Sequence, residues 1–230
     1  MQYVTGTYFK RAGWNPGQFN NQNTYCFIAK ISSRGVFQES MYMNPLTGYN
    51  DDGGDHMMCN ALALVPRTDN VIAVGYWADN NFVWNPGMRA SLLIFADSAL
   101  NKIVTKTFTW GNDYYSWGDS EAKDVTVAEG DGSIYVTGHL RNQHSRKALS
   151  TASNYYDSWL TKAGDHDCYV LRLDAELNRI YAKSFGFASG DTNKFMTCTS
   201  IQVTRNSDHI YIGGNSDGGL FFGKAITNFQ

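Results

Sequence analysis

The chain contains four copies of a short apolar segment that ends in glycine. The four copies are Tyr3-Val4-Thr5-Gly6, Ile72-Ala73-Val74-Gly75, Tyr135-Val136-Thr137-Gly138 and Tyr211-Ile212-Gly213-Gly214, and they are spaced by 69, 63 and 76 residues. A run of apolar and β-branched residues closed by glycine is typical of a buried β-strand. Because an internal repeat of this length marks one structural unit, it restricts the chain to repeat architectures.

Three more strands are expected in each unit. The strand before the glycine-ended segment has alternating apolar positions, at Leu62 and Leu64, Val125 and Val127, and Ile201 and Val203. Turn-forming residues at 68–70, 130–133 and 206–209 separate these two strands, as in a hairpin. Two further strands follow, the first at 26–31, 91–96 and 168–173 and the second near 36–43, 103–110 and 180–186.

Four short strands in each unit, without helical periodicity, are typical of the blade of a β-propeller. We therefore predict an all-β chain: a β-propeller-like array of four-stranded antiparallel blades that start near residues 58, 121 and 197. The units cover 2–70, 71–133 and 134–209, with a partial unit at 210–230, in one repeat region over 1–230. A β-solenoid is the alternative, although its coils are usually shorter, about 20 to 30 residues.

The third unit carries a resemblance to a known family. An alternating strand and an Asp-Gly turn lead to Ile134-Tyr135-Val136-Thr137-Gly138, then to an Asp-Cys-Tyr-Val-Leu-Arg-Leu-Asp strand at 167–174, and finally to Tyr181-Ala182-Lys183-Ser184-Phe185-Gly186. This order resembles the seven-bladed β-propeller-type repeat of many bacterial secreted and surface proteins. The likeness covers most of the chain and is weakest in the first unit. It implies a propeller fold but no activity, because propellers have unrelated functions.

The number of repeats predicts an incomplete ring. A propeller usually needs four to eight blades, and about three and a half cannot close, so open sheet edges and faces would meet water. We expect the chain to be a fragment of a larger ring. A ring closed by another copy of the chain is the second interpretation, since twofold assembly is the commonest symmetry.

The four cysteines occupy two repeat positions. Cys59 and Cys198 stand sixteen residues before a repeat glycine, whereas Cys26 and Cys168 open the strand that follows one. In the middle unit Ala122 and Ser91 take these positions, so both cysteines are absent together. We predict the disulfides Cys26–Cys59 and Cys168–Cys198, each worth about 3 kcal/mol, in a secreted or cell-surface protein. Buried free thiols are the alternative.

Composition limits the partners. The 19 basic and 21 acidic residues give a formal charge of −2, so no nucleic-acid or anionic-membrane partner is expected. No apolar run approaches the roughly 18 residues of a membrane helix, so no membrane insertion is expected.

No catalytic residue, cofactor or metal is predicted. His56 and His166 lie near cysteines, but neither spacing is a known ligand pattern. The acidic runs at 51–55 and 164–167 are expected to be solvated turns, with Ca²⁺ binding as the alternative. No nucleophile elbow or phosphate loop is present. The chain is therefore not expected to be an enzyme, and a propeller-type glycan-active enzyme is kept as the third function.

Aromatic residues of the long connections are the candidate binding residues. They are Trp14, Trp84, Tyr114, Trp117, Tyr155 and Trp159. In a four-stranded meander the second-to-third and fourth-to-first connections emerge at one end, and here they are the long ones. We predict a structural or protein-interaction module of an extracellular assembly that binds protein subunits, including copies of itself, through this end. A carbohydrate-binding module is the alternative function. For Trp14 and Trp84 the alternative is a purely structural role, in which each side chain packs on its own blade.

Overall fold

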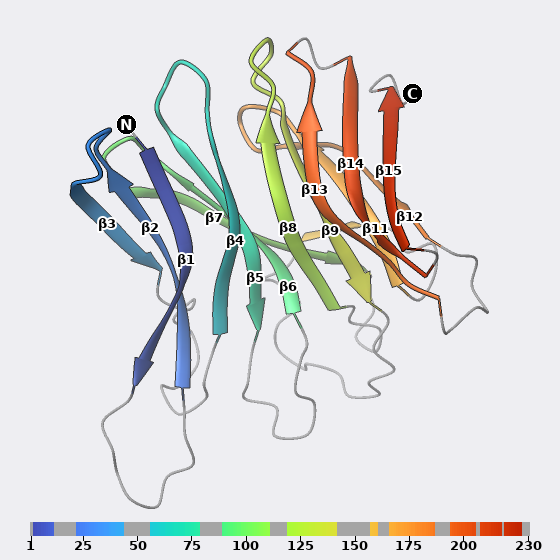
Figure 1. Ribbon diagram of the computed structural model, residues 1–230, viewed down its shortest axis with the longest axis horizontal. Helices are drawn as coiled ribbons and strands as arrows, with labels where there is room; N and C mark the ends of the chain where they lie inside the picture. Colours follow the sequence, from blue (N-terminus) through green and yellow to red (C-terminus); the bar gives the residue numbers. More distant parts are fainter. Residues whose placement is uncertain are drawn as a thin grey trace, which may run out of the picture.

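The computed structural model describes residues 2–11, 22–43, 56–78, 89–110, 119–141, 157–160, 166–186, 194–205, 208–217 and 219–226. Every regular element in these ranges is a β-strand, as Figure 1 shows. The prediction of an all-β chain is therefore confirmed.

Fifteen strands make up the described part of the chain. They are β1(Gln2–Arg11), β2(Gln22–Ile31), β3(Phe37–Met43), β4(His56–Leu64), β5(Val71–Ala78), β6(Arg89–Ala96), β7(Lys102–Trp110), β8(Asp119–Val127), β9(Ile134–Arg141), β10(Asp157–Leu160), β11(His166–Leu173), β12(Arg179–Phe185), β13(Met196–Val203), β14(His209–Ser216) and β15(Gly219–Ile226). The strands β4, β8 and β13 begin within two residues of the expected blade starts at 58, 121 and 197.

Strands that follow one another pair antiparallel in four groups, which we call sheets 1 to 4; β10, between β9 and β11 in the chain, is left out of the third group. The sheets are β1-β2-β3, β4-β5-β6-β7, β8-β9-β11-β12 and β13-β14-β15. One parallel pair, Thr24 with His56, joins sheets 1 and 2 into a continuous eight-stranded sheet that also includes β10. The expected pairing of each alternating strand with the next glycine-ended strand is confirmed in sheets 2, 3 and 4.

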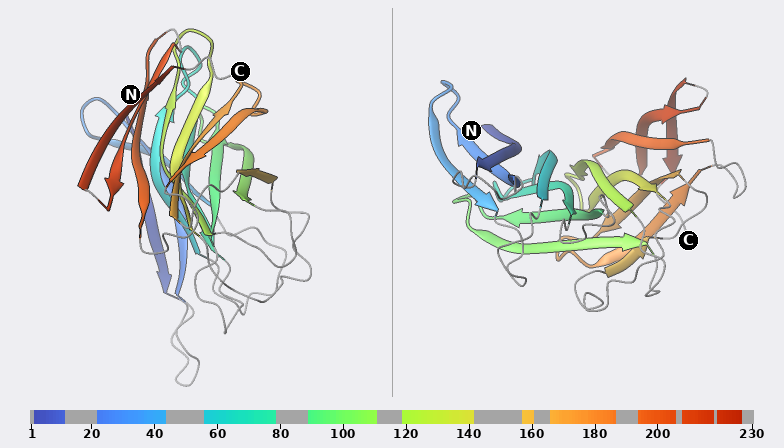
Figure 2. Two further views of the ribbon diagram at one scale, coloured as in Figure 1. Left: turned by 90° about the vertical axis from the view of Figure 1, so that its right-hand side faces the viewer. Right: turned by 90° about the horizontal axis from the view of Figure 1, so that it is seen from below.

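The sheets pack face to face along an open arc, with sheet 1 at one end and sheet 4 at the other (Figure 2). Three hydrophobic clusters fill the spaces between neighbouring sheets. On β9, Val136 belongs to the cluster shared with sheet 2, and Tyr135 belongs to the cluster shared with sheet 4. Both side chains are fully buried. Central strands covered on both faces explain why the glycine-ended segments are apolar without alternation.

The repeat glycines face β-bulges. Each of β4, β8 and β13 has a bulge opposite its glycine, between Cys59 and Ala61, between Ala122 and Asp124, and between Cys198 and Ser200. A Cβ at Gly75, Gly138 or Gly214 would overlap the carbonyl oxygen of Met58, Glu121 or Thr197, respectively. Glycine recurs because the backbone of the bulged strand approaches too closely for any side chain.

Two disulfides join neighbouring sheets, and both predicted pairings are confirmed. Cys26 on β2 bonds to Cys59 on β4, and Cys168 on β11 bonds to Cys198 on β13, with 5.1 Å between Cα atoms in each. At the equivalent place between sheets 2 and 3, the Ser91 N–H donates to Ser120 Oγ at 2.9 Å, and the Ser91 and Tyr169 hydroxyls share a hydrogen bond of 2.9 Å. The disulfides indicate an oxidising, extracellular-type environment.

Two local expectations are corrected. The segment 139–167 was expected to be one long loop, but β10 lies within it and pairs in parallel with β7. Asp167 was expected in a solvated turn, but it is fully buried on β11. Both outcomes depend on neighbours distant in the sequence, which local residue patterns do not report. Among the described residues, no helix is long and apolar enough to cross a membrane.

Candidate functional site

The antiparallel strand order gives every sheet two distinct ends. Strand ends that border residues 12–21, 44–55, 79–88, 111–118, 142–165 and 187–193 share one end, which we call the loop end. The short turns at 32–36, 65–70, 97–101, 128–133 and 174–178 lie at the opposite end, the turn end, as do the ends of β13 and β14 that border 204–208. The short connection between β14 and β15 is at the loop end. This division matches the one expected from strand parity.

The expected aromatic binding residues belong to segments at the loop end. Trp14, Trp84, Tyr114, Trp117 and Tyr155 lie outside the described residues. Trp159 lies on β10, whose neighbouring residues Ser158 and Leu160 pair with Thr109 and Trp110 at the edge of sheet 2. The backbone of Trp159 is therefore placed beside the end of β7, where the segment 111–118 begins.

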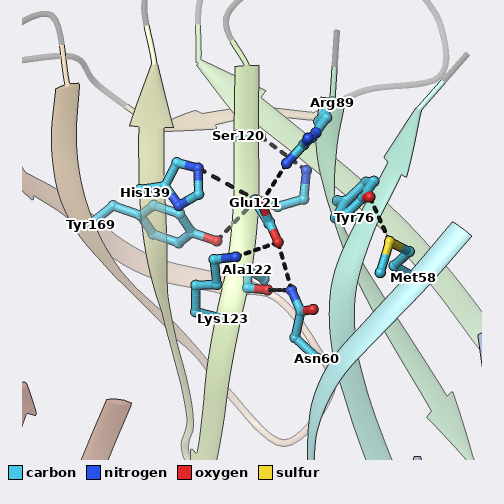
Figure 3. Close-up of polar contacts among 11 residues, drawn as sticks. Met58, Asn60, Tyr76, Arg89, Ser120, Glu121, Ala122, Lys123, His139 and Tyr169 are labelled. Carbon is cyan, nitrogen blue, oxygen red and sulfur yellow. Dashed lines mark hydrogen bonds and ion pairs between the residues drawn. The ribbon is translucent and has the colours of Figure 1, made fainter. Parts of the chain in front are cut away.

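A polar cluster around one buried carboxylate lies at the loop end between sheets 2 and 3 (Figure 3). We call it the loop-end cluster, and it consists of Asn60, Arg89, Glu121, Lys123 and His139. The side chain of Glu121 is only 4% exposed. Its carboxylate accepts hydrogen bonds from Arg89 Nη1 at 2.8 Å, Lys123 Nζ at 2.5 Å and Asn60 Nδ2 at 3.0 Å. A buried carboxylate held by two cations and an amide is well compensated for its loss of water.

The β-bulges supply two of these three donors. Asn60 and Lys123 are the extra residues of the bulges on β4 and β8. A bulge redirects its side chain out of the ordinary alternation. Asn60 Nδ2 also donates to the Ala122 carbonyl at 2.7 Å, so the bulge of one sheet is tied directly to that of the next.

Arg89 is the most exposed cation of the cluster and lies over a tyrosine ring. Its guanidinium is 4.5 Å from the ring centre of Tyr76. The Tyr76 hydroxyl in turn donates to Met58 Sδ at 2.6 Å. Arg89 begins β6 and Tyr76 lies near the end of β5, so both stand where these strands reach the loop end.

The charge states of Glu121 and His139 follow from burial and neighbouring charges. Burial of Glu121 opposes ionisation, but Lys123, His139 and Asn60 outweigh it and lower the net pKa of this carboxyl below its usual value. Burial lowers the pKa of His139 to about 4. The charge of Glu121 raises this pKa and offsets the lowering only in part, because Lys123, Arg89 and His166 lower it further. At neutral pH the cluster therefore holds a carboxylate and a neutral imidazole. His139 Nδ1 is buried and makes no hydrogen bond with any described residue.

This arrangement suits structural support better than proton transfer. A general acid or base works best with a pKa near the working pH, whereas both pKa values here are shifted well below neutrality. Tyr169, beside the cluster, is fully buried, and burial raises its pKa far above the usual tyrosine value. In the described part of the chain, no three His, Cys, Asp or Glu residues come together as a metal site. His56 instead lies with Nδ1 3.0 Å from Thr24 Oγ1, across the junction of sheets 1 and 2.

Comparison with protein-family models and with curated proteins finds no match for this chain. The geometry of the loop end therefore carries the functional argument. Sequence reasoning missed the loop-end cluster, because its members come from four strands. One signal of the cluster was present in the sequence. Cys59 and Ala122 stand at the same repeat position, and each is followed directly by a polar residue of the cluster, Asn60 and Lys123 respectively.

We expect acid to destabilise the protein partly through His139. Its folded pKa of about 4 lies below the ordinary 6.5, so the unfolded chain binds the extra proton between these values. The contribution of His139 to the free energy of unfolding is full above pH 6.5 and is lost as the pH falls towards 4. It amounts to at most about 3 kcal/mol, since one pKa unit is about 1.4 kcal/mol. His56, whose pKa burial also lowers, acts in the same direction, and Glu121 adds a loss below about pH 4.5.

The test is urea denaturation of the native chain and of the His139→Gln variant at pH values from 8 to 4. The variant should show a shallower fall in unfolding free energy between pH 6.5 and 4. Between pH 7 and 8 the two curves should be parallel, because the imidazole is neutral in both states there. Equal slopes between pH 6.5 and 4 would contradict the assignment.

Proposed function

We propose that this chain is a structural, protein-interaction module of a secreted or cell-surface assembly, which contacts its partners through the loop end. One observation carries the proposal: each junction between neighbouring sheets is braced at that end. The disulfide Cys26–Cys59 joins sheets 1 and 2, the loop-end cluster joins sheets 2 and 3, and Cys168–Cys198 joins sheets 3 and 4. Rigid strands beneath long connections are a common arrangement for binding surfaces.

The proposed contact residues are the aromatic side chains of the loop-end segments. They are Trp14, Trp84, Tyr114, Trp117, Tyr155 and Trp159. Tryptophan and tyrosine are enriched at protein interfaces and often dominate their binding energy. The partners proposed are protein subunits, with further copies of this chain among them. Glycan binding through the same aromatic rings is the alternative, and a glycan-active enzyme ranks third because the loop-end cluster holds no group poised for acid–base work at neutral pH.

We also propose that the four sheets are propeller-type blades of the secreted and surface repeat family. Support comes from the common strand order of the sheets and from their face-to-face packing around an arc. A solenoid would pair strands of successive coils in parallel, whereas here nearly all pairing is antiparallel between strands of one sheet, apart from the single pair Thr24 with His56 and the short strand β10 on β7.

The outer face of sheet 4 supports a larger array of such sheets. Leu220 and Phe222 on β15 are 89% and 78% exposed. By strand register they correspond to Cys168 and Val170 on β11, which sheet 4 buries almost completely. A further sheet of the same kind, from a longer polypeptide or another copy, would cover this apolar face.

The loop-end proposal is tested by mapping the interface of the isolated partner complex. Cross-linking and mass spectrometry on the oxidised chain should place the contacts at the loop end. Trp14→Ala and Trp84→Ala should each weaken binding at least tenfold, as expected for interface tryptophans. The matched controls are Glu129→Ala and Asp208→Ala at the turn end, which should leave binding unchanged.

Two results would redirect the proposal. An interface centred on the turns at 65–70, 128–133 and 204–208 would show that the binding end is wrong. Selective binding on a glycan array that Trp14→Ala or Trp84→Ala abolishes would replace the structural role by the carbohydrate-binding alternative.

A further inference from the structure

Two turns at the turn end hold a leucine in a backbone conformation that leucine rarely adopts. Leu100, between β6 and β7, has a φ of 57°, and Leu177, between β11 and β12, has a φ of 66°. This left-handed region is unfavourable for a bulky side chain. Strain of this kind persists only where the surrounding structure holds the residue in place.

The two turns share one set of hydrogen bonds. Each begins with an aspartate, Asp97 or Asp174, whose N–H donates to the carbonyl of the asparagine four positions later at 3.0 Å. The aspartate carbonyl accepts from the leucine N–H, at 2.9 and 3.1 Å respectively. The carboxylate accepts from the backbone and side-chain N–H groups of Asn101 or Asn178 at 2.7 to 3.0 Å. The turn backbone is therefore the same at both places.

The turn of sheet 1 has this backbone without the leucine. The Ser32 N–H donates to the Val36 carbonyl and the Gly35 N–H donates to the Ser32 carbonyl, both at 2.9 Å. Gly35 stands at the position of the two leucines with a φ of 77°, and a Cβ there would meet no described atom within 4 Å. Because glycine adopts this φ without strain, the turn itself does not need a leucine. The leucine side chains must therefore act outside their own turns.

Each leucine side chain enters the junction with the preceding sheet. Leu100 belongs to the hydrophobic cluster between sheets 1 and 2, together with Ile28 of β2. Leu177 belongs to the cluster between sheets 2 and 3, together with Leu93 of β6. Both leucines are only 5% exposed. Burial of their apolar surface offsets the unfavourable φ.

A lysine of the preceding sheet contacts the same turn. Lys30 Nζ on β2 donates to the Ser98 carbonyl at 2.8 Å, and Lys106 Nζ on β7 donates to the Leu177 carbonyl at 2.9 Å. Each of these hydrogen bonds joins two neighbouring sheets, between residues 68 and 71 positions apart in sequence. A leucine and a lysine thus fasten the turn end of each junction, opposite the disulfide or the loop-end cluster.

We propose that the turns 97–101 and 174–178 are latches, which hold closed the turn end of the junctions between sheets 1 and 2 and between sheets 2 and 3. When a latch is released, the two sheets separate at the turn end, while the loop end stays joined. Because strain at the leucine opposes the closing contacts, a latch can open while the strands of both sheets stay paired. The latches therefore set the angle between neighbouring sheets. This device is independent of the loop-end function, and either can fail without the other.

The test measures distances between sheets at the turn end. Cysteines that replace Ser33, Lys102 and Glu129, which are exposed residues at the turn ends of sheets 1, 2 and 3, carry spin labels, two at a time, in the complete oxidised chain. Double electron–electron resonance gives the distribution of distances between the two labels. Leu100→Gly keeps the turn, as Gly35 does in sheet 1, and removes the side chain from the junction. We expect it to shift the 33–102 distances to longer values and to leave the 102–129 distances unchanged.

Leu177→Gly is the matched control, with the opposite result expected: the labels at 102 and 129 move apart, and those at 33 and 102 do not. Lys30→Met and Lys106→Met keep an apolar stem and remove the donor, so each should cause a smaller shift at its own junction. If a glycine variant fails to fold, the lysine variants decide. Unchanged distances in the folded variants would overturn the proposal. A change of both distances in one glycine variant would also overturn it, because the leucine would then support the whole fold rather than one junction.

Discussion

Replacement of Gly138 by alanine is expected to lower the free energy of unfolding by about 3 kcal/mol or more. The new Cβ would overlap the carbonyl of Glu121, which is backbone of the paired strand β8. Relief would require β8 to move away from β9, and that movement would also disturb the carboxylate contacts of the loop-end cluster. Substitutions that force backbone apart in a packed interior fall in the upper range of single-residue effects.

The measurement is urea denaturation followed by circular dichroism, with Gly223→Ala as the control. A Cβ at Gly223 meets nothing within 4 Å, so this change should alter the unfolding free energy by less than about 0.5 kcal/mol. A loss of similarly small size at Gly138 would show that the bulge does not explain the repeat glycine.

Removal of both disulfides is expected to lower the free energy of unfolding by about 6 kcal/mol. The cysteines are 33 and 30 residues apart in sequence, and a loop of this length is worth about 3 kcal/mol in the chain-entropy description. The two bonds lie at different sheet junctions, so their contributions should add. The sum is comparable to the total stability of many domains, about 5 to 15 kcal/mol.

The loss should be confined to the ends of the arc. Without the bonds, hydrogen exchange should speed up first in sheets 1 and 4, while β5 and β9 stay protected by the packing between sheets 2 and 3. The test compares the native chain with the variant in which Cys26, Cys59, Cys168 and Cys198 are all alanine. A reducing agent should lower the melting temperature of the native chain and leave that of the variant unchanged. Equal melting temperatures for the oxidised and reduced native chain would contradict the prediction.

Much of the framework could be predicted from local patterns. Alternation of apolar residues, turn residues and the repeated glycine located β4, β5, β8, β9, β13 and β14. The cysteine pairing also followed from the sequence, because residues at the same repeat position occupy the same place in successive sheets. Ser91 and Ala122 stand where the other units have cysteines. The absence of both cysteines marked the junction of sheets 2 and 3, which is joined by hydrogen bonds instead of a disulfide.

The loop-end cluster could not be predicted in this way. Glu121 looked like a polar residue at the start of an alternating strand, yet its side chain is 4% exposed and holds three donors from β4, β6 and β8. Its burial depends on the approach of sheet 2, and the reach of Asn60 and Lys123 depends on bulges. A bulge is defined by the register of two paired strands, and no local pattern states that register.

The sequence by itself determined that the chain is all-β, which strands follow which, where glycine recurs and which cysteines pair, because these properties are local or are repeated at constant spacing. Only the tertiary structure decided why the glycines are required, which polar groups are buried together and which edges and faces stay open. The physical reason is that bulged carbonyls, the ionisation of Glu121 and His139 and the exposure of Val4 and Leu220 are set by neighbouring strands, and those neighbours are brought close by packing between sheets.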